Sequence, residues 1–252
     1  MRRSVEEQKN NNNIGQDQKA KAYNRLKRRV SYVEIGLGLA FLLILLLTGW
    51  TFNLRDIAVR VASGPFWNVL IYFLFLTALF EIITLPLAVY SRFVIERRFG
   101  LLRQSGLAWV WDYIKGVLLS LILGGAAIEA LYFFIRVTGK WWWLSTGMIF
   151  AFFFVLMAQL APVLIMPIFY KFKPLADDDL SARLTALCER TGARVRGIYE
   201  WGLSSKTAAV NAALVGWGPT RRVILSDNLV KDFSAPEVEV ILAHELGHHQ
   251  LR

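Results

Sequence analysis

Four apolar stretches dominate the hydropathy pattern of the chain, and each is long enough to cross a bilayer. They cover residues 35–52, 65–90, 116–135 and 141–161. A hydrocarbon core of roughly 30 Å needs about 20 predominantly apolar residues in a helix. The last stretch continues to residue 170, but Pro162 and Pro167 predict a kinked extension beyond the span. Residues 30–174 are therefore expected to form a transmembrane region with about four helices.

After Pro174 the pattern changes to short segments of mixed polarity. Residues 177–191 begin with acidic side chains and stop at Gly192, which is typical of a helix. Strand-like segments follow at residues 194–201, 208–215 and 222–225. The turn at residues 216–219 would pair the last two strands antiparallel. Residues 175–252 therefore predict a small α+β domain.

A final helix begins at Ser234, where Glu237 three residues later completes a capping box. Pro236 lies in its first turn, where the missing N–H costs nothing. The helix is apolar around most of its circumference, so we expect it to be buried. It carries all 3 histidines of the chain, within residues 244–249.

Basic residues alternate between the ends of the apolar stretches. Residues 1–29 carry nine Lys or Arg, and the three following loops carry two, five and two. Because Lys and Arg are enriched in cytoplasmic loops, the amino terminus and everything after residue 170 are expected to be cytoplasmic. The polar composition of residues 1–29 also predicts a disordered tail.

The composition excludes an ordinary soluble globular protein. The chain is 55% hydrophobic and 19% charged, whereas soluble domains are about 45–50% apolar and about 25% charged. Its net charge of +10 is assigned to topology and anionic lipid, not to nucleic acid. The only cysteine, Cys188, excludes a disulfide framework and lies on an apolar helix face, where we expect a core residue.

Two carboxylates, Glu81 and Glu129, lie inside the apolar stretches. Such groups are costly in a bilayer and normally face protein or water. One interpretation is hydrogen-bonded packing between helices. The other is the lining of a water-filled intramembrane cavity, and the sequence leaves both open.

The segment His244-Glu245-Leu246-Gly247-His248 matches the H-E-x-x-H pattern. Histidines four apart on a helix lie about 40° apart around the axis, so both imidazoles can bind one zinc ion. Glu245 would then take a proton from a water molecule bound to that ion. His249 points about 140° away from His244 and is not expected to be a ligand. The sequence therefore predicts a hydrolytic metal site with Glu245 as its base.

A catalytic zinc site uses three protein ligands and an open position, and this chain supplies two evident ones. Three carboxylates upstream of the motif, Glu200, Glu237 and Glu239, have no feature that assigns them. Either the third ligand lies downstream of Arg252, or the site is incomplete. We favour the first alternative, in which the chain is an amino-terminal fragment.

Several stretches together resemble the type I CAAX prenyl endopeptidases, membrane zinc metalloproteases related to the bacterial protease HtpX. They are residues 93–100, 111–115, 167–175, 205–206, 211–212, 222–227 and 242–248. The resemblance covers the chain from about residue 30 onward. It implies one Zn²⁺ ion held by His244 and His248, with Glu245 as base, and a glutamate ligand and further helices downstream. It also implies a water-filled chamber and an edge strand near Asn211 on which substrate peptide adds as a strand.

The leading hypothesis is thus a multi-pass α-helical membrane protein with a zincin-like domain that cuts peptide bonds at the cytoplasmic face. Its substrate would be a peptide or protein, either lipid-modified or, as for HtpX, a damaged membrane protein. It would lie in a bacterial plasma membrane or an endoplasmic reticulum. The rival hypothesis is a membrane scaffold whose site is catalytically incomplete, and a transporter has support only from Glu81 and Glu129.

Overall fold

The computed structural model describes residues 2–216 and 221–250, with side chains described from residue 18 to residue 247 within those ranges. The chain divides into two compact units. The first contains residues 1–100 and 106–143, and the second contains residues 101–105 and 144–252. The turn predicted at residues 216–219 lies largely outside the described residues.

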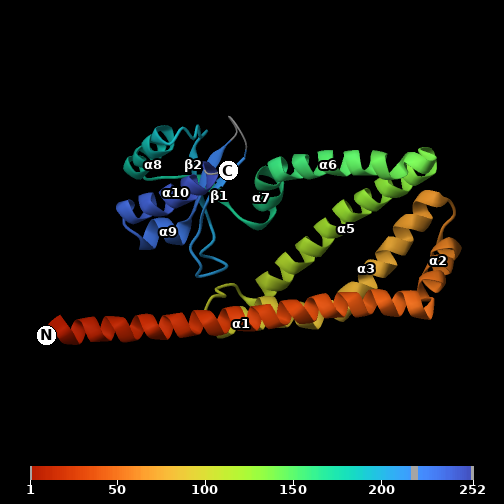
Figure 1. Ribbon diagram of the computed structural model, residues 1–252, viewed down its shortest axis with the longest axis horizontal. Helices are drawn as coiled ribbons and strands as arrows, with labels where there is room; N and C mark the ends of the chain where they lie inside the picture. Colours follow the sequence, from red (N-terminus) through yellow and green to blue (C-terminus); the bar gives the residue numbers. More distant parts are fainter. Residues whose placement is uncertain (1, 217–220, 251–252) are drawn as a thin grey trace. The chain divides into compact units, whose positions relative to one another are not determined.

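Four helical stretches are long and apolar enough to cross a membrane (Figure 1). They are Gln18–Thr48, Pro65–Arg98, Gly106–Val137 and Gly139–Phe169. Each contains one of the four predicted spans and extends beyond it, except that the first ends earlier. A multi-pass helical membrane region followed by a small α/β domain is therefore confirmed.

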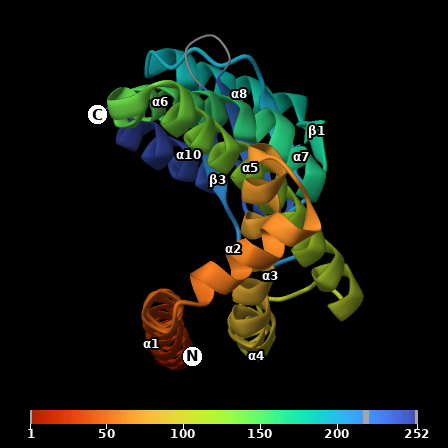
Figure 2. The same cartoon turned by 90° about the vertical axis from the view of Figure 1, so that its right-hand side faces the viewer.

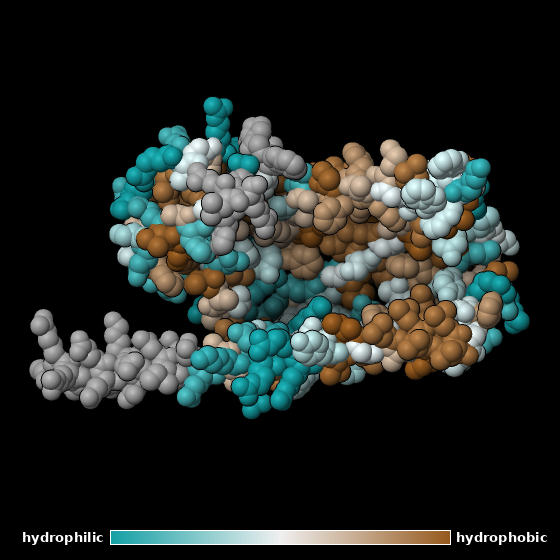
Figure 3. All heavy atoms as spheres, viewed as in Figure 1, coloured by the Kyte–Doolittle hydropathy of each residue, from teal (hydrophilic) through white to brown (hydrophobic). Residues whose placement is uncertain are grey.

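The first helix, α1 (Arg2–Thr48), is continuous through residues 2–29, where we expected disorder. Its polar segment contacts the second span: the hydroxyl of Tyr23 donates to Glu96 (2.7 Å), and Lys27 forms an ion pair with the same carboxylate (2.6 Å). The surface along α1 changes from hydrophilic to hydrophobic toward Thr48 (Figure 3). These contacts fix the part of α1 around Tyr23 and Lys27 against the second span, and the composition of the segment does not reveal them.

The first span ends at Thr48 and not at residue 52 as predicted. Gly49 has φ 70°, a left-handed conformation that glycine adopts without steric cost. A separate helix, α2 (Trp50–Val61), follows and packs against α3 (Pro65–Val89). Figure 2, which views α1 nearly along its axis, shows α2 leading from α1 to α3.

The second and third spans continue as helices beyond their apolar segments. The α3 helix passes through η1 (Tyr90–Val94) into α4 (Ile95–Arg98), and α5 (Gly106–Val137) begins ten residues before the apolar segment. Phe93 and Trp109 pack edge to face across these extensions, with ring centroids 5.5 Å apart. Hydropathy predicts only the apolar part of each helix, and the structure shows that both helices continue past it.

The fourth span has the kink that its prolines predict. After η2 (Gly139–Trp141), α6 (Trp142–Leu160) ends where η3 (Ala161–Ile165) begins with Pro162 near its start. A last turn, α7 (Met166–Phe169), contains Pro167 and leads into β1 (Phe172–Pro174). Because β1 already belongs to the sheet, the soluble fold begins before the boundary that we expected after Pro174.

The second unit contains a four-stranded sheet of order β1-β2-β4-β3. The other strands are β2 (Ile198–Trp201), β3 (Ala212–Val215) and β4 (Arg222–Ser226). β3 pairs antiparallel with β4, as predicted, while β2 and β4 are parallel and β1 is antiparallel to β2. The helices are α8 (Asp178–Arg190), α9 (Asp227–Asp232) and α10 (Ala235–Gln250).

The two faces of this sheet bury different clusters, because successive strand side chains point to opposite faces. On one face, Ile198, Val223 and Leu225 join buried residues of α8, α9 and α10, including Cys188, which is a core residue as expected. On the other face, Trp201 and Ile224 pack with Met166, Tyr170 and Phe172 from the end of the fourth span. The sheet thus separates α10 from the segment that leaves the membrane.

Only one face of α10 is buried, which corrects the expectation that most of its circumference would be. Leu242 is fully buried and Val240 is 69% exposed. Leu242→Ala is expected to lower the unfolding free energy by about 2–5 kcal/mol, and Val240→Ala by about 0.5 kcal/mol or less. Thermal unfolding of the purified protein in detergent measures both. Equal losses would contradict this orientation of α10.

Candidate metal centre

The amino terminus of α10 is set by its predicted capping residues. The backbone N–H and the hydroxyl of Ser234 both donate to Glu237 Oε2, at 2.8 and 2.7 Å. These hydrogen bonds lower the pKa of Glu237, and the bond from the hydroxyl has the larger effect. The helix is then continuous from Ala235 to Gln250. The H-E-x-x-H segment therefore lies entirely on one regular helix.

The helix places His244 and His248 one turn apart, with Glu245 between them in sequence. His244 is exposed and Glu245 is partly exposed, whereas Leu242 and Leu246 are buried against the sheet. This follows from helix geometry, because a residue two positions from Leu242 lies about 200° around the axis. His244 therefore lies on the face of α10 that does not pack on the sheet. The side chain of His248 lies outside the described residues.

The donor set of this segment fits a zinc ion in chemistry and spacing. Two imidazoles at i and i+4 can approach one ion, and a carboxylate at i+1 stays close without being required as a ligand. Among the described residues, no group of three or more His, Cys, Asp or Glu side chains could hold a metal. The third ligand of the proposed site therefore stays a prediction.

The three upstream glutamates are occupied elsewhere. Glu237 caps α10, and Glu239 forms an ion pair with Arg183 of α8. Glu200 pairs with Lys173 at 2.9 Å, across strands β1 and β2. Each of the three carboxylates thus has a partner within the second unit.

Asn211 directly precedes β3, the strand at one edge of the sheet. Its N–H donates to the hydroxyl of Ser226 (2.9 Å), and its carbonyl accepts from the N–H of Ser226 (2.9 Å). The residue is exposed. β3 also packs against α10, so this edge strand and the histidine-bearing helix are neighbours.

A carboxylate that the sequence analysis did not single out, Asp227, organises the loop before β3. It accepts hydrogen bonds from the hydroxyl and the N–H of Ser204 and from the N–H of Asn228. Burial acts to raise the pKa of Asp227, but these hydrogen bonds outweigh it, and the pKa is lower than usual. Ser204 is a polar residue that could have pointed to this loop. Its partner Asp227 lies 23 positions away, so the sequence alone does not connect the two residues.

A lowered folded-state pKa means that Asp227 stabilises the protein above the ordinary pKa of about 3.9 and loses this effect as pH falls through the folded value. Asp227→Asn is therefore expected to cost about 1–3 kcal/mol at pH 7 and to weaken the loss of stability below about pH 5. Unfolding temperature measured against pH tests this. Asp232→Asn, at an exposed aspartate of the same helix, is the control. Equal effects of the two substitutions would contradict the stabilising role of Asp227.

A second feature that sequence reasoning missed is the segment of residues 101–105, which belongs to the second unit although α4 and α5 flank it in the first. The N–H of Arg103 donates to the carbonyl of Lys206 (3.0 Å), and that of Ala208 to the carbonyl of Leu101 (2.9 Å). The loop before β3 therefore pairs with a segment about one hundred residues earlier.

The two intramembrane glutamates differ in their surroundings. Glu81 accepts a hydrogen bond from the hydroxyl of Tyr113 (2.6 Å), which links α3 to α5, and it lines a small apolar cavity of about 230 Å³. Glu129 Oε1 is buried and has no hydrogen-bond partner among the described residues. The contact of Glu81 with Tyr113 supports hydrogen-bonded packing between helices at this residue. The water-filled chamber stays a prediction.

Comparison with known proteins identifies both parts of the chain. Residues 8–171 match the family described as CAAX prenyl protease N-terminal, five membrane helices. Residues 174–252 match peptidase family M48. The described residues contain four helices long and apolar enough to span.

Individual relatives agree. The chain is 35% identical over 182 residues to CAAX prenyl protease 1 of Saccharomyces cerevisiae, covering 69% of this chain and 39% of the yeast protein. It is 34% identical over 175 residues to an Arabidopsis thaliana homologue, covering 68% of this chain and 41% of that protein. The crystal structure of S. mikatae Ste24p superposes with a TM-score of 0.78 at 28% identity, covering 90% of this chain and 55% of that one.

The chain thus spans about two fifths of the length of the CAAX prenyl proteases that it matches. Metalloproteases of this family generally use zinc, in agreement with the donor set on α10. Both the membrane region and the α/β domain have their counterparts in these relatives. The chain therefore belongs to the M48 metalloprotease family, as an integral multi-pass membrane protein of the CAAX prenyl protease type.

Proposed function

We propose that this protein is a zinc-dependent endopeptidase that hydrolyses peptide bonds of lipid-modified substrates at the cytoplasmic face of its membrane. The observation that supports this most strongly is the placement of His244, Glu245 and His248 on one unbroken helix of an M48 chain. The excess of basic residues in the amino terminus and second loop supports a cytoplasmic catalytic domain.

In this mechanism His244 and His248 would hold the ion through their imidazole nitrogens. Zinc, when bound, polarises the substrate carbonyl and makes water a stronger acid at neutral pH. The Glu245 carboxylate takes the proton of the attacking water. Glu245 then returns that proton to the leaving amine, which completes hydrolysis of the peptide bond.

The edge of β3 supplies a place for an extended substrate. A peptide that adds to an exposed strand gains main-chain hydrogen bonds and places alternate side chains toward the protein. Asn211 directly precedes this strand, and α10 packs beside the strand. We propose Asn211 as a substrate-binding residue on this basis.

The exposure of His244 sets a requirement for this mechanism. A site that shields the reacting groups from bulk water needs further protein over this face of α10. We propose that the third zinc ligand and this cover come from sequence downstream of Arg252, since the curated relatives are longer. If His244 faces bulk water in the complete gene product, the proposal fails.

Chelation of zinc is expected to abolish peptidase activity of the complete gene product in its membrane. Treatment with 1,10-phenanthroline should remove activity, and added Zn²⁺ should restore it, because the reaction depends on the ion that His244 and His248 hold. Cleavage of a synthetic C-terminal peptide, followed by mass spectrometry, is the measurement. Unchanged cleavage after verified metal removal would contradict the proposal, because hydrolysis would then not depend on zinc.

The same assay separates the two protease alternatives. A lipid chain adds about 0.8 kcal/mol per buried CH₂ to membrane partitioning, so a farnesylated peptide should be cleaved much more efficiently than its unmodified form. Equal cleavage of both peptides, together with cleavage of unfolded membrane proteins, would favour an HtpX-like function instead. Absence of any cleavage with zinc bound would favour a scaffold.

A further inference from the structure

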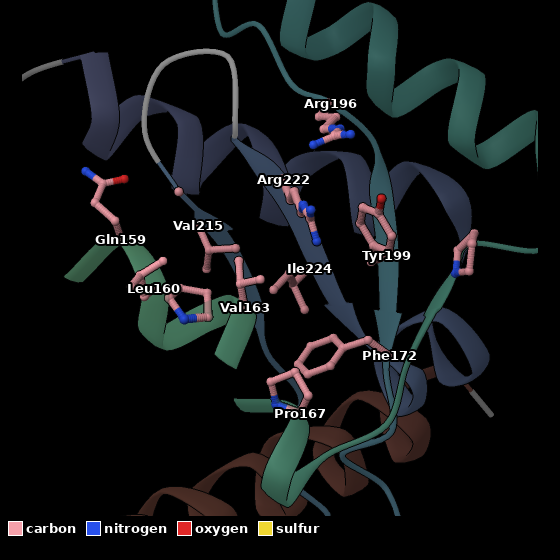
Figure 4. A pocket seen from close by; sticks show the side chains of 13 residues that line it. Gln159, Leu160, Val163, Pro167, Phe172, Arg196, Tyr199, Val215, Arg222 and Ile224 are labelled. Atoms are coloured by element: carbon pink, nitrogen blue, oxygen red, sulfur yellow. The ribbon is translucent and has the colours of Figure 1, made fainter. Parts of the chain in front are cut away.

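A cavity of about 330 Å³ lies in the second unit, on the sheet face opposite α8 and α10 (Figure 4). One wall comes from the end of the fourth span, with Val163 of η3 and Pro167 of α7. The other wall comes from the sheet, with Phe172, Tyr199 and Arg222. The cavity thus lies between the end of the candidate span Gly139–Phe169 and strands β1, β2 and β4.

One end of this cavity is cationic. The Arg222 guanidinium lies 5.2 Å from the centroid of the Tyr199 ring, and its Nε is buried without a hydrogen-bond partner. Arg196 lies close to the same end (Figure 4) and is exposed. Neither arginine has an ion pair with a carboxylate among the described residues. Two guanidinium groups therefore line this end of the cavity, and their N–H groups are available to donate hydrogen bonds to a ligand.

The rest of the cavity is apolar. Val163, Pro167, Phe172 and Ile224 gather around the part away from Arg196 (Figure 4). Val163 and Pro167 lie among the last residues of the candidate span Gly139–Phe169. With this helix across a bilayer, the apolar part of the cavity would lie near the boundary between acyl chains and headgroups.

We propose that this cavity binds an anionic phospholipid, with the phosphate on Arg196 and Arg222 and the first part of an acyl chain against Val163, Pro167 and Phe172. Planar guanidinium groups match phosphate oxygens with paired hydrogen bonds, and basic pockets at membrane surfaces attract anionic lipids. The cationic end of the cavity suits the anionic headgroup of such a lipid, and the apolar part suits its acyl chain. This site is separate from the H-E-x-x-H face of α10, because the sheet lies between them.

The test uses the complete gene product in detergent with added phosphatidylglycerol or phosphatidylcholine, and native mass spectrometry counts the bound lipid. We expect selective retention of phosphatidylglycerol, about tenfold or more weaker in Arg196→Gln/Arg222→Gln. The matched control is Arg190→Gln/Arg194→Gln, which makes the same charge change outside the cavity and should retain the lipid. If the double variant does not fold, Arg196→Gln alone and Arg222→Lys replace it, and each should weaken retention.

Three results would overturn the proposal. Equal retention of phosphatidylglycerol by the cavity variants and the wild type would show that the arginines do not bind it. Thermal stabilisation by inorganic phosphate equal to that by phosphatidylglycerol would assign the site to free phosphate. Displacement of the bound lipid by a farnesylated peptide, with loss of peptide affinity in the variants, would assign the cavity to substrate.

Discussion

Replacing Glu245 with Gln is expected to lower kcat for peptide hydrolysis by about 10²–10⁴-fold, the usual contribution of a general acid–base group. The amide keeps the size of the side chain but cannot take the proton of the attacking water. Because Glu245 is not assigned as a ligand, the variant should keep its zinc. Kinetics and metal content of the complete gene product, measured on the same preparation, test both parts.

A matched control is available on the same helix. Glu239 pairs with Arg183 on the surface, away from the proposed reaction, so Glu239→Gln should cleave like the wild type. Near wild-type cleavage by Glu245→Gln with zinc still bound would show that another group acts as the base. Loss of zinc from Glu245→Gln would instead make this carboxylate a ligand, against the role proposed here.

Alanine at His244 or His248 is expected to have a still larger effect, since either change removes a zinc ligand. Loss of a residue that merely supports a ligand typically weakens metal affinity by about 10–100-fold, so loss of a ligand should weaken it more. Both variants should therefore lose bound zinc and peptidase activity together. Metal analysis after dialysis against a weak chelator measures the first effect.

The third histidine provides the control for this experiment. His249 lies about 140° around the helix from His244, so His249→Ala should retain both zinc and activity. Equal zinc loss in all three variants would point to general damage of the carboxyl-terminal turn of α10. Retention of zinc by His244→Ala would rule out the assigned ligand pair.

The parts of the fold that follow from local patterns were predictable. The spans and the start of α10 need only apolar length, proline positions and the pair Ser234 and Glu237. The antiparallel pairing of β3 and β4 follows from one turn. These signals act between residues close in sequence, where periodicity and capping decide the outcome.

Features that depend on distant residues were not predictable. Tyr23 and Lys27 in the polar part of α1 contact Glu96, about seventy positions away. Residues 101–105 pair with the loop before β3, and β1 joins β2 across an intervening helix. A single sequence contains no record of such pairings.

The candidate site shows the same division. The spacing of His244 and His248 predicts a metal-binding helix, but an apolar sequence around α10 did not reveal which face would pack on the sheet. The sheet takes Leu242 and Leu246 and leaves His244 exposed. The third ligand depends on a residue far away in sequence, so the motif alone does not identify it.

The most direct test of zinc binding by α10 is a crystal structure of the complete gene product with anomalous diffraction recorded at the zinc absorption edge. We expect one strong anomalous peak about 2.0–2.1 Å from an imidazole nitrogen of both His244 and His248, with Glu245 nearby but outside the ligand set. A fully occupied zinc ion bound elsewhere, with these two histidines in bulk water, would contradict the proposed metal centre.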